Sequence, residues 1–394
     1  TRYALVGGPF GSNLTTRDYV DDGVPVIRGT NLPQDSEFLD DGFVFVSEGK
    51  ADALASNLAH PGDIIFTQRG TLGQVGIIPE SARFRRYVVS QSQMKLTVNH
   101  EIVDPRFIYY FFRHPNTVQD ILNRSITSGV PHINLGILKS FDIPLPPRRI
   151  QSEIVRFLTA YDNLLDNNRR RIALLEESAR LLYKEWFIRI RFPGRDHTQI
   201  IDGVPIGWER RPLGKICCEV RDIVSPDILE PDTPYIGLEH IPRRSVTLGD
   251  WGMAEQVTSS KHRFNAGEII FGKIRPYFHK VGIAFIDGVA SSDAIVIRPA
   301  SDLMRSMVLM TVSSDEFVAA TSQSMKEGSK MPRADWKQMQ AYDVLIPPLG
   351  LLSTFDEHIK NNIAQLKMLT FANQKLRAAR NLLLPRLMSG ELLV

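Results

Sequence analysis

The feature that most constrains this fold is an internal repeat with a period of about 200 residues. Residues Asp142–Pro147 match Asp343–Pro348 at a shift of 201 positions, and Pro61–Phe66 match Ala266–Phe271 at a shift of 205. A period of this size indicates a duplicated pair of domains rather than a solenoid of short repeats. A tandem pair presents two similar but non-identical surfaces, which suits a target that is itself in two unlike parts.

Length and composition place the chain among folded globular proteins. Its 394 residues predict two to four domains. Hydrophobic residues at 43% and charged residues at 23% are typical of a folded rather than a disordered chain. A formal charge of +3 is compatible with a polyanionic partner without proving one.

The remaining compositional signals are mostly absences. The two cysteines, Cys217 and Cys218, are adjacent, so neither a disulfide framework nor a four-ligand zinc site can be drawn. No apolar run reaches the roughly 18 residues of a membrane span and no signal peptide opens the chain, so we expect a cytoplasmic protein without a membrane partner. Because the chain starts at Thr1 rather than Met, we expect a few residues before it.

Each copy divides into a strand-rich part and a helical part. Short apolar runs bounded by Gly, Pro and Asp are typical of strands. They occur at Val24–Ile27, Phe43–Val46, Asp63–Phe66, Gln74–Ile78 and Val88–Leu96, and again at Pro234–Leu238, Glu268–Phe271, Val281–Ile286 and Ala294–Ile297. An amphipathic helix is predicted after each set, at Pro105–Arg124 and Asp302–Met325, followed by polar glycine turns at Ser128–His132 and Glu327–Pro332.

The helical parts show alternating spacings of four and three residues, which is the seam of a coiled coil. The seam runs from Ile154 to Trp186 in the first copy and from Phe355 to Leu387 in the second, at a constant shift of 201. A Pro-Pro pair prevents each helix from extending upstream. Pro193-Gly194 is predicted to end the first helix, and Pro385 and Gly390 roughly mark the end of the second. The simplest arrangement is antiparallel, with Ile154 opposite Leu387 and Asn168 opposite Asn373.

A search for catalytic motifs finds none that is convincing. No methyltransferase motif of the Asn/Asp-Pro-Pro-aromatic type and no P-loop is present. Asp41, Glu48 and Lys50 loosely fit a magnesium-dependent nuclease, but the second copy has no counterpart, so we interpret them as a surface turn. We expect no catalytic residues, no metal site and no enzymatic activity, which favours a binding module.

The helical segments and the strand motifs resemble a known family. The stretch Ile143–Pro147 followed by Leu174–Phe187 resembles the central conserved region of type I restriction-modification specificity subunits, and Leu376–Leu392 is similar to their C-terminal conserved region. Val204–Trp208 resembles the opening of their second target-recognition domain. The sequence departs from the family at Arg148–Ile150, where the family often has Leu-x-Glu, and at Gly350–Leu352, which lacks the usual Glu-Gln.

The resemblance implies an α+β fold in which two similar mixed α/β target-recognition domains are separated by two long antiparallel coiled-coil helices with pseudo-two-fold symmetry. The implied segments are residues 1–145 for the first recognition domain, 146–192 for the central helix, 193–346 for the second domain and 347–394 for the C-terminal helix.

The resemblance also implies partners. The chain would recognise a bipartite, asymmetric site on double-stranded DNA without a cofactor of its own. Two methyltransferase subunits would bind it and supply S-adenosylmethionine for adenine methylation, and restriction/translocase subunits would join for cleavage.

Given this resemblance, polar side chains on the loops after equivalent strands are the predicted DNA contacts, because base edges and phosphates are read by Arg, Lys, Asn, Gln, Ser and Thr. In the first domain these are Thr67, Gln68, Arg69, Gly70, Thr71 and Gln74, a phosphate patch of Arg83, Arg85 and Arg86, a polar edge with Gln91 and Gln93, and His132 and Asn134 after the glycine turn. In the second domain they are Lys273, Arg275, Tyr277, His279 and Lys280, with His240, Arg243 and Arg244 upstream and Lys330 and Arg333 by the glycine turn.

Two other classes of function remain open from the sequence. One is a stand-alone magnesium-dependent nuclease that uses Asp41, Glu48 and Lys50. The other is an adaptor whose coiled coil joins proteins without binding DNA.

Overall fold

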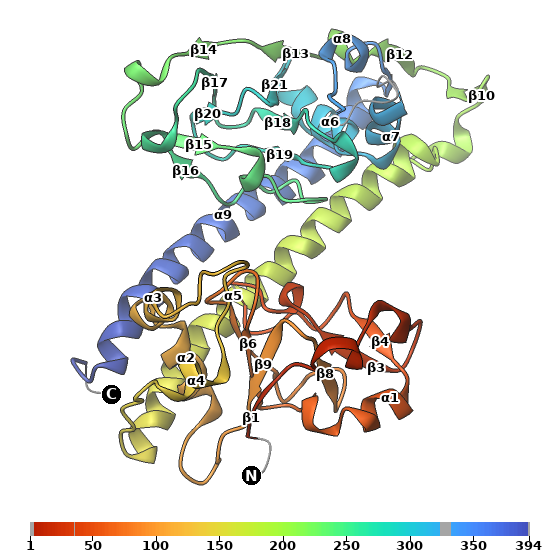
Figure 1. Ribbon diagram of the computed structural model, residues 1–394. Coiled ribbons are helices and arrows are strands. Elements are labelled where there is room, and N and C mark those ends of the chain that lie inside the picture. Colours follow the sequence, from red (N-terminus) through yellow and green to blue (C-terminus); the bar gives the residue numbers. More distant parts are fainter. Residues whose placement is uncertain (1–3, 35, 324–331, 393–394) are drawn as a thin grey trace. The chain divides into compact units, whose positions relative to one another are not determined.

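The computed structural model describes residues 4–34, 36–323 and 332–392 (Figure 1). The chain forms two compact units. The first unit comprises the residues up to Asn167 together with those from Lys375 onward, and the second comprises Asn168–Gln374. Two long helices, α5 (Arg148–Tyr183) and α9 (Leu349–Met388), contribute residues to both units.

The first unit contains a four-stranded sheet of order β1-β9-β6-β7 and a five-stranded sheet of order β2-β4-β3-β8-β5. Its strands are β1 (Leu5–Gly7), β2 (Tyr19–Val20), β3 (Val24–Ile27), β4 (Val44–Val46), β5 (Leu58–Ala59), β6 (Ile64–Thr67), β7 (Val75–Ile77), β8 (Tyr87–Val89) and β9 (Gln93–Leu96). Its shorter helices are α1 (Glu48–Ala53), α2 (Pro105–Arg113), α3 (Pro115–Asn123) and α4 (Leu135–Lys139).

The second unit repeats this plan with sheets of order β13-β21-β18-β19 and β14-β17-β20-β15-β16. These strands are β13 (Cys217–Val220), β14 (Ile223–Val224), β15 (Pro234–Ile236), β16 (Gly252–Met253), β17 (Lys261–Phe264), β18 (Ile269–Gly272), β19 (Val281–Ile283), β20 (Gly288–Ala290) and β21 (Ala294–Pro299). Two short pairs join β10 (Ile200–Ile201) to β11 (Val204–Pro205) and β12 (Glu209–Pro212) to β22 (Asp343–Ile346). The shorter helices are α6 (Asp302–Val312), α7 (Asp315–Gln323) and α8 (Trp336–Met339).

The two larger sheets differ only at their edges. The order β4-β3-β8-β5 in the first unit equals β16-β15-β20-β17 in the second, including one parallel pair in each, β3 with β8 and β15 with β20. An additional strand lies beside β4 in the first unit and beside β17 in the second, at opposite ends of the shared order. The repeat in the sequence therefore corresponds to a repeated core with different edge strands.

A glycine in the middle of one strand fixes a loop to the sheet in each unit. A Cβ atom on Gly76 of β7 would lie 2.6 Å from Leu32 Cδ2, and one on Gly282 of β19 would lie 2.6 Å from Leu248 Cδ2. Only glycine allows this close approach. It locks the β3–β4 loop (residues 28–43) and the β15–β16 loop (residues 237–251) against equivalent strands.

Several predicted element boundaries were wrong for local reasons. The predicted strand Val88–Leu96 is two strands separated by a turn at residues 90–92. The helix predicted at Pro105–Arg124 breaks at His114, because Pro115 disfavours the helical conformation of the residue before it. The helix predicted at Asp302–Met325 breaks at Ser313 and Ser314, and its last two residues lie outside the described residues.

The second long helix ends between Pro385 and Gly390, as predicted, whereas the first ends before Pro193. Pro385 lies inside α9, which continues to Met388. The first long helix continues from α5 into a π-helical turn over Lys184–Ile188 and stops before Pro193, where Ile190 adopts a φ of +55°. A left-handed residue ends a helix because it cannot continue the right-handed hydrogen-bond ladder.

The predicted pairing of the two seams is confirmed at its central position. In the second unit Asn168 Nδ2 donates to Asn373 Oδ1 at 2.9 Å, and Asn362 Nδ2 donates to the Leu175 carbonyl at 3.2 Å. From the first contact to the second the residue number rises on α5, from 168 to 175, and falls on α9, from 373 to 362, so the two helices are antiparallel. In the first unit Arg380 of α9 forms an ion pair with Asp162 of α5 at 2.7 Å. No helix in the described ranges is both long and apolar enough to cross a membrane.

Candidate nucleic-acid interface

Three polar loops meet at one end of the four-stranded sheet in the first unit. They are the loop after β6 (residues 68–74), the β8–β9 turn (residues 90–92) and the segment after the glycine turn (residues 132–134). Gln68 N donates to Ser92 O at 2.7 Å, and Gln68 O accepts from Ile133 N at 2.9 Å. Both backbone groups of Gln68 therefore join its neighbours, and we call this arrangement the first edge.

The second unit holds its corresponding loops with the same two hydrogen bonds. Lys273 N donates to Asp293 O at 2.8 Å, and Lys273 O accepts from Ala334 N at 2.9 Å. The loop after β18 (residues 273–280), the β20–β21 turn (residues 291–293) and residues 333–335 form this second edge. In both units the structure therefore brings the strand-end loop and the segment after the glycine turn side by side.

Exposed polar groups on the first edge come from four of the predicted residues and one glycine. Arg69, Gly70, Thr71, Gln91 and Asn134 are exposed, whereas Gln68, Gln74 and His132 are half-buried. Two of the exposed side chains already have structural partners. Gln91 Nε2 donates to the Gly11 and Leu14 carbonyls, and Asn134 Oδ1 caps α4 at Ile137 N. No hydrogen bond or ion pair within the described part of the chain holds the Arg69 guanidinium, so it is the cation best placed to meet a ligand.

Two predicted contacts on the first edge are inside the protein. Thr67 and Gln93 are only 2% and 1% exposed. Thr67 Oγ1 donates to Gln74 Oε1 at 3.2 Å, and Ser90 Oγ donates to Gln93 Oε1. A buried polar side chain needs such partners. These residues therefore support the loops from beneath, and the prediction of surface contacts for Thr67 and Gln93 was wrong.

The predicted phosphate patch is divided in the structure. Arg83 and Arg85 are exposed, but Arg86 forms ion pairs with Glu48 and with Asp52, the latter at 2.7 Å. Both acids lie on α1, and Arg83 N donates to Asp40 in the β3–β4 loop. These contacts join Arg86 to α1 and the Arg83 backbone to Asp40 rather than to the first edge, and the two acids of α1 neutralise Arg86.

The second edge carries larger side chains than the first. Arg275, Tyr277 and Arg333 are exposed, with Tyr277 at 52%. Arg333 forms an ion pair with Asp293 at 3.2 Å, and Lys273 Nζ donates to Ser292 O at 3.2 Å. Lys330 lies outside the described residues. Basic groups are thus present here, but part of their charge is already balanced.

The β15–β16 loop brings two of its three predicted site residues, Arg243 and Arg244, beside the second edge. The Arg243 guanidinium lies 3.9 Å from the centroid of the Phe278 ring, a cation–π contact. Arg244 N donates to His279 O at 2.9 Å, and Lys280 Nζ donates to Leu238 O. Burial, and then the nearby Arg243 charge, lower the pKa of Lys280. His240 instead turns inward, accepting a hydrogen bond from Gly237 N at 3.0 Å.

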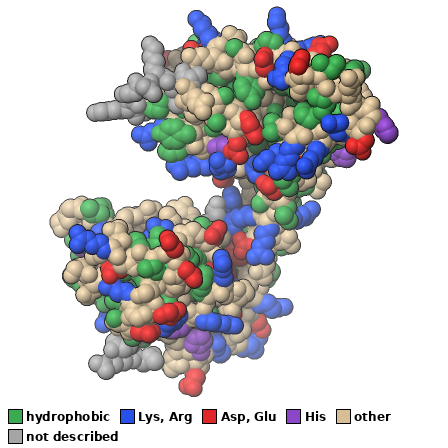
Figure 2. All heavy atoms as spheres, turned by 90° about the vertical axis from the view of Figure 1, so that its right-hand side faces the viewer, with side chains coloured by type: hydrophobic (Ala, Val, Ile, Leu, Met, Phe, Trp, Pro, Cys, Tyr) green, Lys and Arg blue, Asp and Glu red, His purple; other side chains and the backbone are tan. Residues whose placement is uncertain are grey.

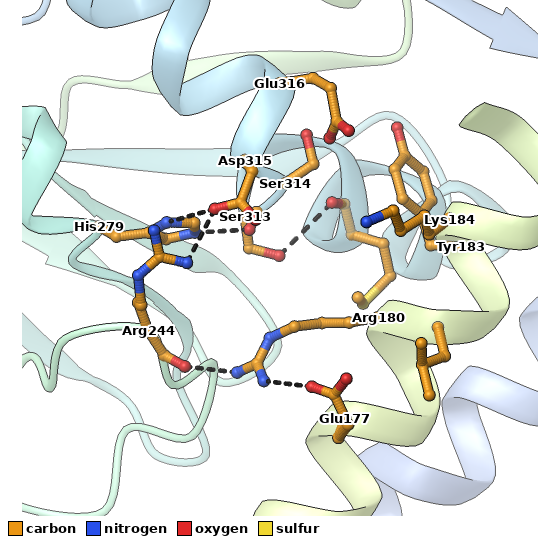
Figure 3. Close-up of a pocket in the computed structure, with 12 residues that line it drawn as sticks. Glu177, Arg180, Tyr183, Lys184, Arg244, His279, Ser313, Ser314, Asp315 and Glu316 are labelled. Atoms are coloured by element: carbon orange, nitrogen blue, oxygen red, sulfur yellow. Dashed lines mark hydrogen bonds and ion pairs between the residues drawn. The ribbon is translucent and has the colours of Figure 1, made fainter. Parts of the chain in front are cut away.

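His279 is buried beneath the second edge, so the prediction of a surface contact there was wrong. It is 7% exposed, and its Nε2 lies 2.6 Å from Ser313 O, which can only accept, so the ring donates from this nitrogen. Arg244 forms an ion pair with Asp315 at 2.9 Å beside it. These residues and Arg180 line a cavity of about 340 Å³ (Figure 3). Burial is the main cause that lowers the pKa of His279.

Left-handed backbone positions mark both edges. The second edge has φ values of +56° at Arg244, +50° at Arg275 and +55° at His279. In the first edge glycines hold the corresponding strand-end positions, with +105° at Gly70 and +83° at Gly73. Such a conformation costs a non-glycine residue about 1–3 kcal/mol and persists where the surroundings impose it, often at functional sites. The sequence did not predict these positions, because neither arginine nor histidine is typical of a left-handed backbone conformation.

Comparisons with known proteins agree with this geometry. Residues 16–177 match the family model described as the type I restriction modification DNA specificity domain. Residues 16–177 therefore belong to the type I restriction-modification DNA specificity domain family. The MjaIX specificity subunit of Methanocaldococcus jannaschii is 22% identical over 353 residues, which cover 84% of this chain and 78% of the relative. The EcoDI specificity subunit of Escherichia coli is 23% identical over 343 residues, covering 76% and 73%.

A solved structure shares the fold of this chain. The crystal structure of a type I restriction-modification S subunit from M. genitalium superposes with a TM-score of 0.55 at 15% identity. The match covers 97% of this chain and 92% of that one. At this identity the comparison speaks for the fold alone.

The three residues considered for a nuclease site each have a different partner. Asp41 Oδ1 accepts from Gly42 N at 2.7 Å, Glu48 pairs with Arg86, and Lys50 pairs with Asp18 at 2.9 Å. Within the described ranges no group of three or more His, Cys, Asp and Glu side chains could hold a metal ion. The interpretation of these residues as a surface turn was wrong for Glu48 and Lys50, which lie on α1, and the three side chains share no site.

The charge of the molecular surface is mixed rather than concentrated. Figure 2 shows blue Lys and Arg side chains interspersed with red Asp and Glu side chains on the face that it presents. With a net charge of only +3, the chain has no strong overall field to attract a polyanion. Any attraction for a polyanion would therefore have to come from local groups of basic side chains.

Proposed function

We propose that this chain is the DNA-recognition subunit of a type I restriction-modification complex and that each edge reads one half of a bipartite, asymmetric target. The observation that carries the proposal is the pair of equivalent edges. Each is held by the same two backbone hydrogen bonds, yet the exposed side chains differ, with Arg69 and Thr71 on the first and Arg275 and Tyr277 on the second. Equal scaffolds with unequal side chains suit two unequal half-sites.

The exposed groups have the chemistry that base recognition requires. A guanidinium can donate two hydrogen bonds to guanine in the major groove, and phosphate contacts fix the orientation of the protein without reading sequence. We assign Arg69 and Arg275 to base contacts. We assign Arg83, Arg85, Arg243 and Arg333 to phosphates, with Thr71, His132, Asn134 and Tyr277 as further polar contacts.

The long helices would set the distance between the half-sites. We propose that residues 1–145 and 193–346 are the recognition domains, that helices 146–192 and 347–394 separate them, and that a pseudo-two-fold axis relates the halves. The Asn168–Asn373 hydrogen bond supports an antiparallel pair. DNA readers commonly contact half-sites about one helical turn, or about 34 Å, apart.

Partner subunits would supply the chemistry. The relatives are named specificity subunits, and we propose that this chain, itself not an enzyme, directs two methyltransferase subunits, which bind S-adenosylmethionine, and restriction/translocase subunits. The nuclease and adaptor alternatives are less favoured, since Asp41, Glu48 and Lys50 have separate partners and both edges present DNA-compatible groups.

The decisive experiment is a half-site exchange. Residues 1–145 are replaced by the equivalent domain of a relative, and base-resolved methylation of host DNA is compared with that of the unmodified chain. One half of the methylated motif should change, while the other half and the spacer stay the same. If both halves change together, or neither does, two independent reading edges are excluded. Cleavage of DNA by the purified chain with Mg²⁺ alone would instead support the nuclease.

A further inference from the structure

We propose that Glu176 on α5 is a positioning residue for the second edge, so that specificity for the second half-site depends on a helix outside the second recognition domain. This inference rests on the proposed function. It identifies a residue that contacts no DNA and acts through the β15–β16 loop.

Glu176 is the buried centre of a dense set of hydrogen bonds. Glu176 is only 5% exposed. Its Oε1 accepts from Ser245 Oγ at 2.6 Å, Val246 N at 3.0 Å, Thr247 N at 3.0 Å and Thr247 Oγ1 at 2.6 Å. A single carboxylate oxygen thus fixes three consecutive residues of the loop. Hydrogen bonds to a charged acceptor are stronger than neutral ones, particularly where water is excluded.

The loop that Glu176 fixes leads directly to the second edge. Arg244, next to Ser245, donates its backbone N–H to His279 O at 2.9 Å, and Arg243 lies over the Phe278 ring. Phe278 also lies 5.8 Å from the Arg275 guanidinium. A displacement of the loop at Ser245 would therefore move the groups that orient Arg275.

A second contact from α5 acts on the same loop. Arg180, one helical turn after Glu176, donates to the Arg244 carbonyl and forms ion pairs with Glu176 at 3.3 Å and Glu177 at 3.4 Å. Figure 3 shows Arg180 extending from the helix toward Arg244. The helix therefore holds the loop at Arg244 and again at Ser245–Thr247. Arg244 itself adopts a left-handed conformation.

The test compares three substitutions on α5. Glu176→Ala removes all the acceptors, Glu176→Gln keeps an acceptor at Oε1 but loses the charge, and Glu177→Ala removes an exposed neighbour that shares Arg180. Each chain, in complex with its methyltransferase subunits, selects sequences from a randomised double-stranded DNA library. Glu176→Ala should reduce base discrimination about tenfold in one half of the motif only. Glu176→Gln should retain most of it and Glu177→Ala nearly all.

A readout without DNA tests the same positioning. Amide hydrogen exchange at Val246 and Thr247 should be faster in Glu176→Ala, and near the unmodified rate in Glu176→Gln and Glu177→Ala. A merely destabilised protein would lose active fraction and discrimination in both halves alike.

The outcomes separate this inference from the proposed function. If the unmodified chain selects no motif, both fail. If it selects a bipartite motif and Glu176→Ala keeps full discrimination in both halves, or loses it equally in both, the positioning role alone is overturned. Unchanged exchange at Val246 and Thr247 would overturn it as well.

Discussion

The β3–β4 loop and the β15–β16 loop occupy equivalent places but are held by different parts of the chain. Ile77 N donates to Glu37 O at 3.1 Å in the first unit, and Ile283 N donates to Val246 O at 2.8 Å in the second, which establishes the equivalence. Beyond that shared bond, the anchors differ.

In the first unit the anchors lie on α2. Arg106 forms an ion pair with Glu37, and Arg113 donates to Ser36 O at 3.0 Å and to Gln34 O. In the second unit they lie on the long helices, with Glu176 on α5 and, on α9, Gln374, whose Nε2 donates to Gly249 O at 2.9 Å. The equivalent loop is thus held by α2 in the first unit and by the two long helices in the second.

The largest expected effect follows from transferring each domain to a relative. A graft of residues 1–145 carries Arg106 and Arg113 with it and should retain recognition of its half-site. A graft of residues 193–346, placed in a recipient with alanine at the position of Glu176, should lose about tenfold or more in discrimination. Methylation mapping of both grafts measures this.

Restoring glutamate at that single position provides the matched control for the second graft. Recovery of discrimination would sharpen the comparison between the two loops. If both grafts retained full discrimination without this glutamate, the second domain would not depend on the long helix for recognition.

The next effect compares the two exposed arginines. Arg69→Ala should weaken binding by on the order of 1–3 kcal/mol and relax specificity at one position of the first half, and Arg275→Ala should do the same in the second half. Binding to a set of single-base target variants separates the roles. A uniform loss across all variants would assign that arginine to a phosphate.

A smaller effect concerns the left-handed positions at the start of each strand-end loop. No heavy atom lies within 4 Å of a Cβ built on Gly70, so Gly70→Ala should cost only backbone strain, about 1 kcal/mol. At Arg275 the comparison of Arg275→Gly with Arg275→Ala removes the same side chain, and glycine should be more stable by a similar amount. Denaturant unfolding without DNA measures both pairs. Equal stability of the two Arg275 variants would contradict the equivalence of the loops.

The smallest expected effect is a pH dependence of the second edge. Burial lowers the pKa of His279 in the folded protein, so the neutral ring is favoured there. Its contribution to stability is present above the ordinary histidine pKa of about 6.5 and is lost as the pH falls through the folded value. Gly73 holds the corresponding position in the first edge and cannot titrate.

Hydrogen exchange at the two edges between pH 8 and pH 5, corrected for the intrinsic rate, measures this difference. Acid should open the second edge more than the first, and His279→Asn should reduce the difference, because asparagine tolerates a left-handed backbone without a charge. An identical acid response of that variant would show that another group is responsible.

The sequence predicted what is periodic or repeated. The paired motifs ending at Phe66 and Phe271 predicted β6 and β18, and the alternation of four and three predicted both long helices and the Asn168–Asn373 pair. Strands of two residues, such as β2 and β14, carry no detectable period, so the edges of the larger sheets could not be predicted.

The site was predicted as a set of loops better than as a set of residues. Loop composition indicated both edges, but not that Gln93 and His279 are buried, since a polar side chain in a loop can face either way. Glu176 carried no signal at all. On the helix it reads as one more charged residue, and its partners at Ser245–Thr247 are about 70 positions away.

The asparagine layer between α5 and α9 has a consequence for self-association. Under the repeat shift of 201, two copies of α5 paired in the same register would set Asn168 against Ile172, and two copies of α9 would set Asn373 against Leu369. A buried amide without a partner costs about 1–3 kcal/mol, and each such homodimer would contain the mismatch twice. Only the pairing of α5 with α9 satisfies both amides. One hydrogen bond therefore favours the pairing of α5 with α9 over the pairing of either helix with its own copy.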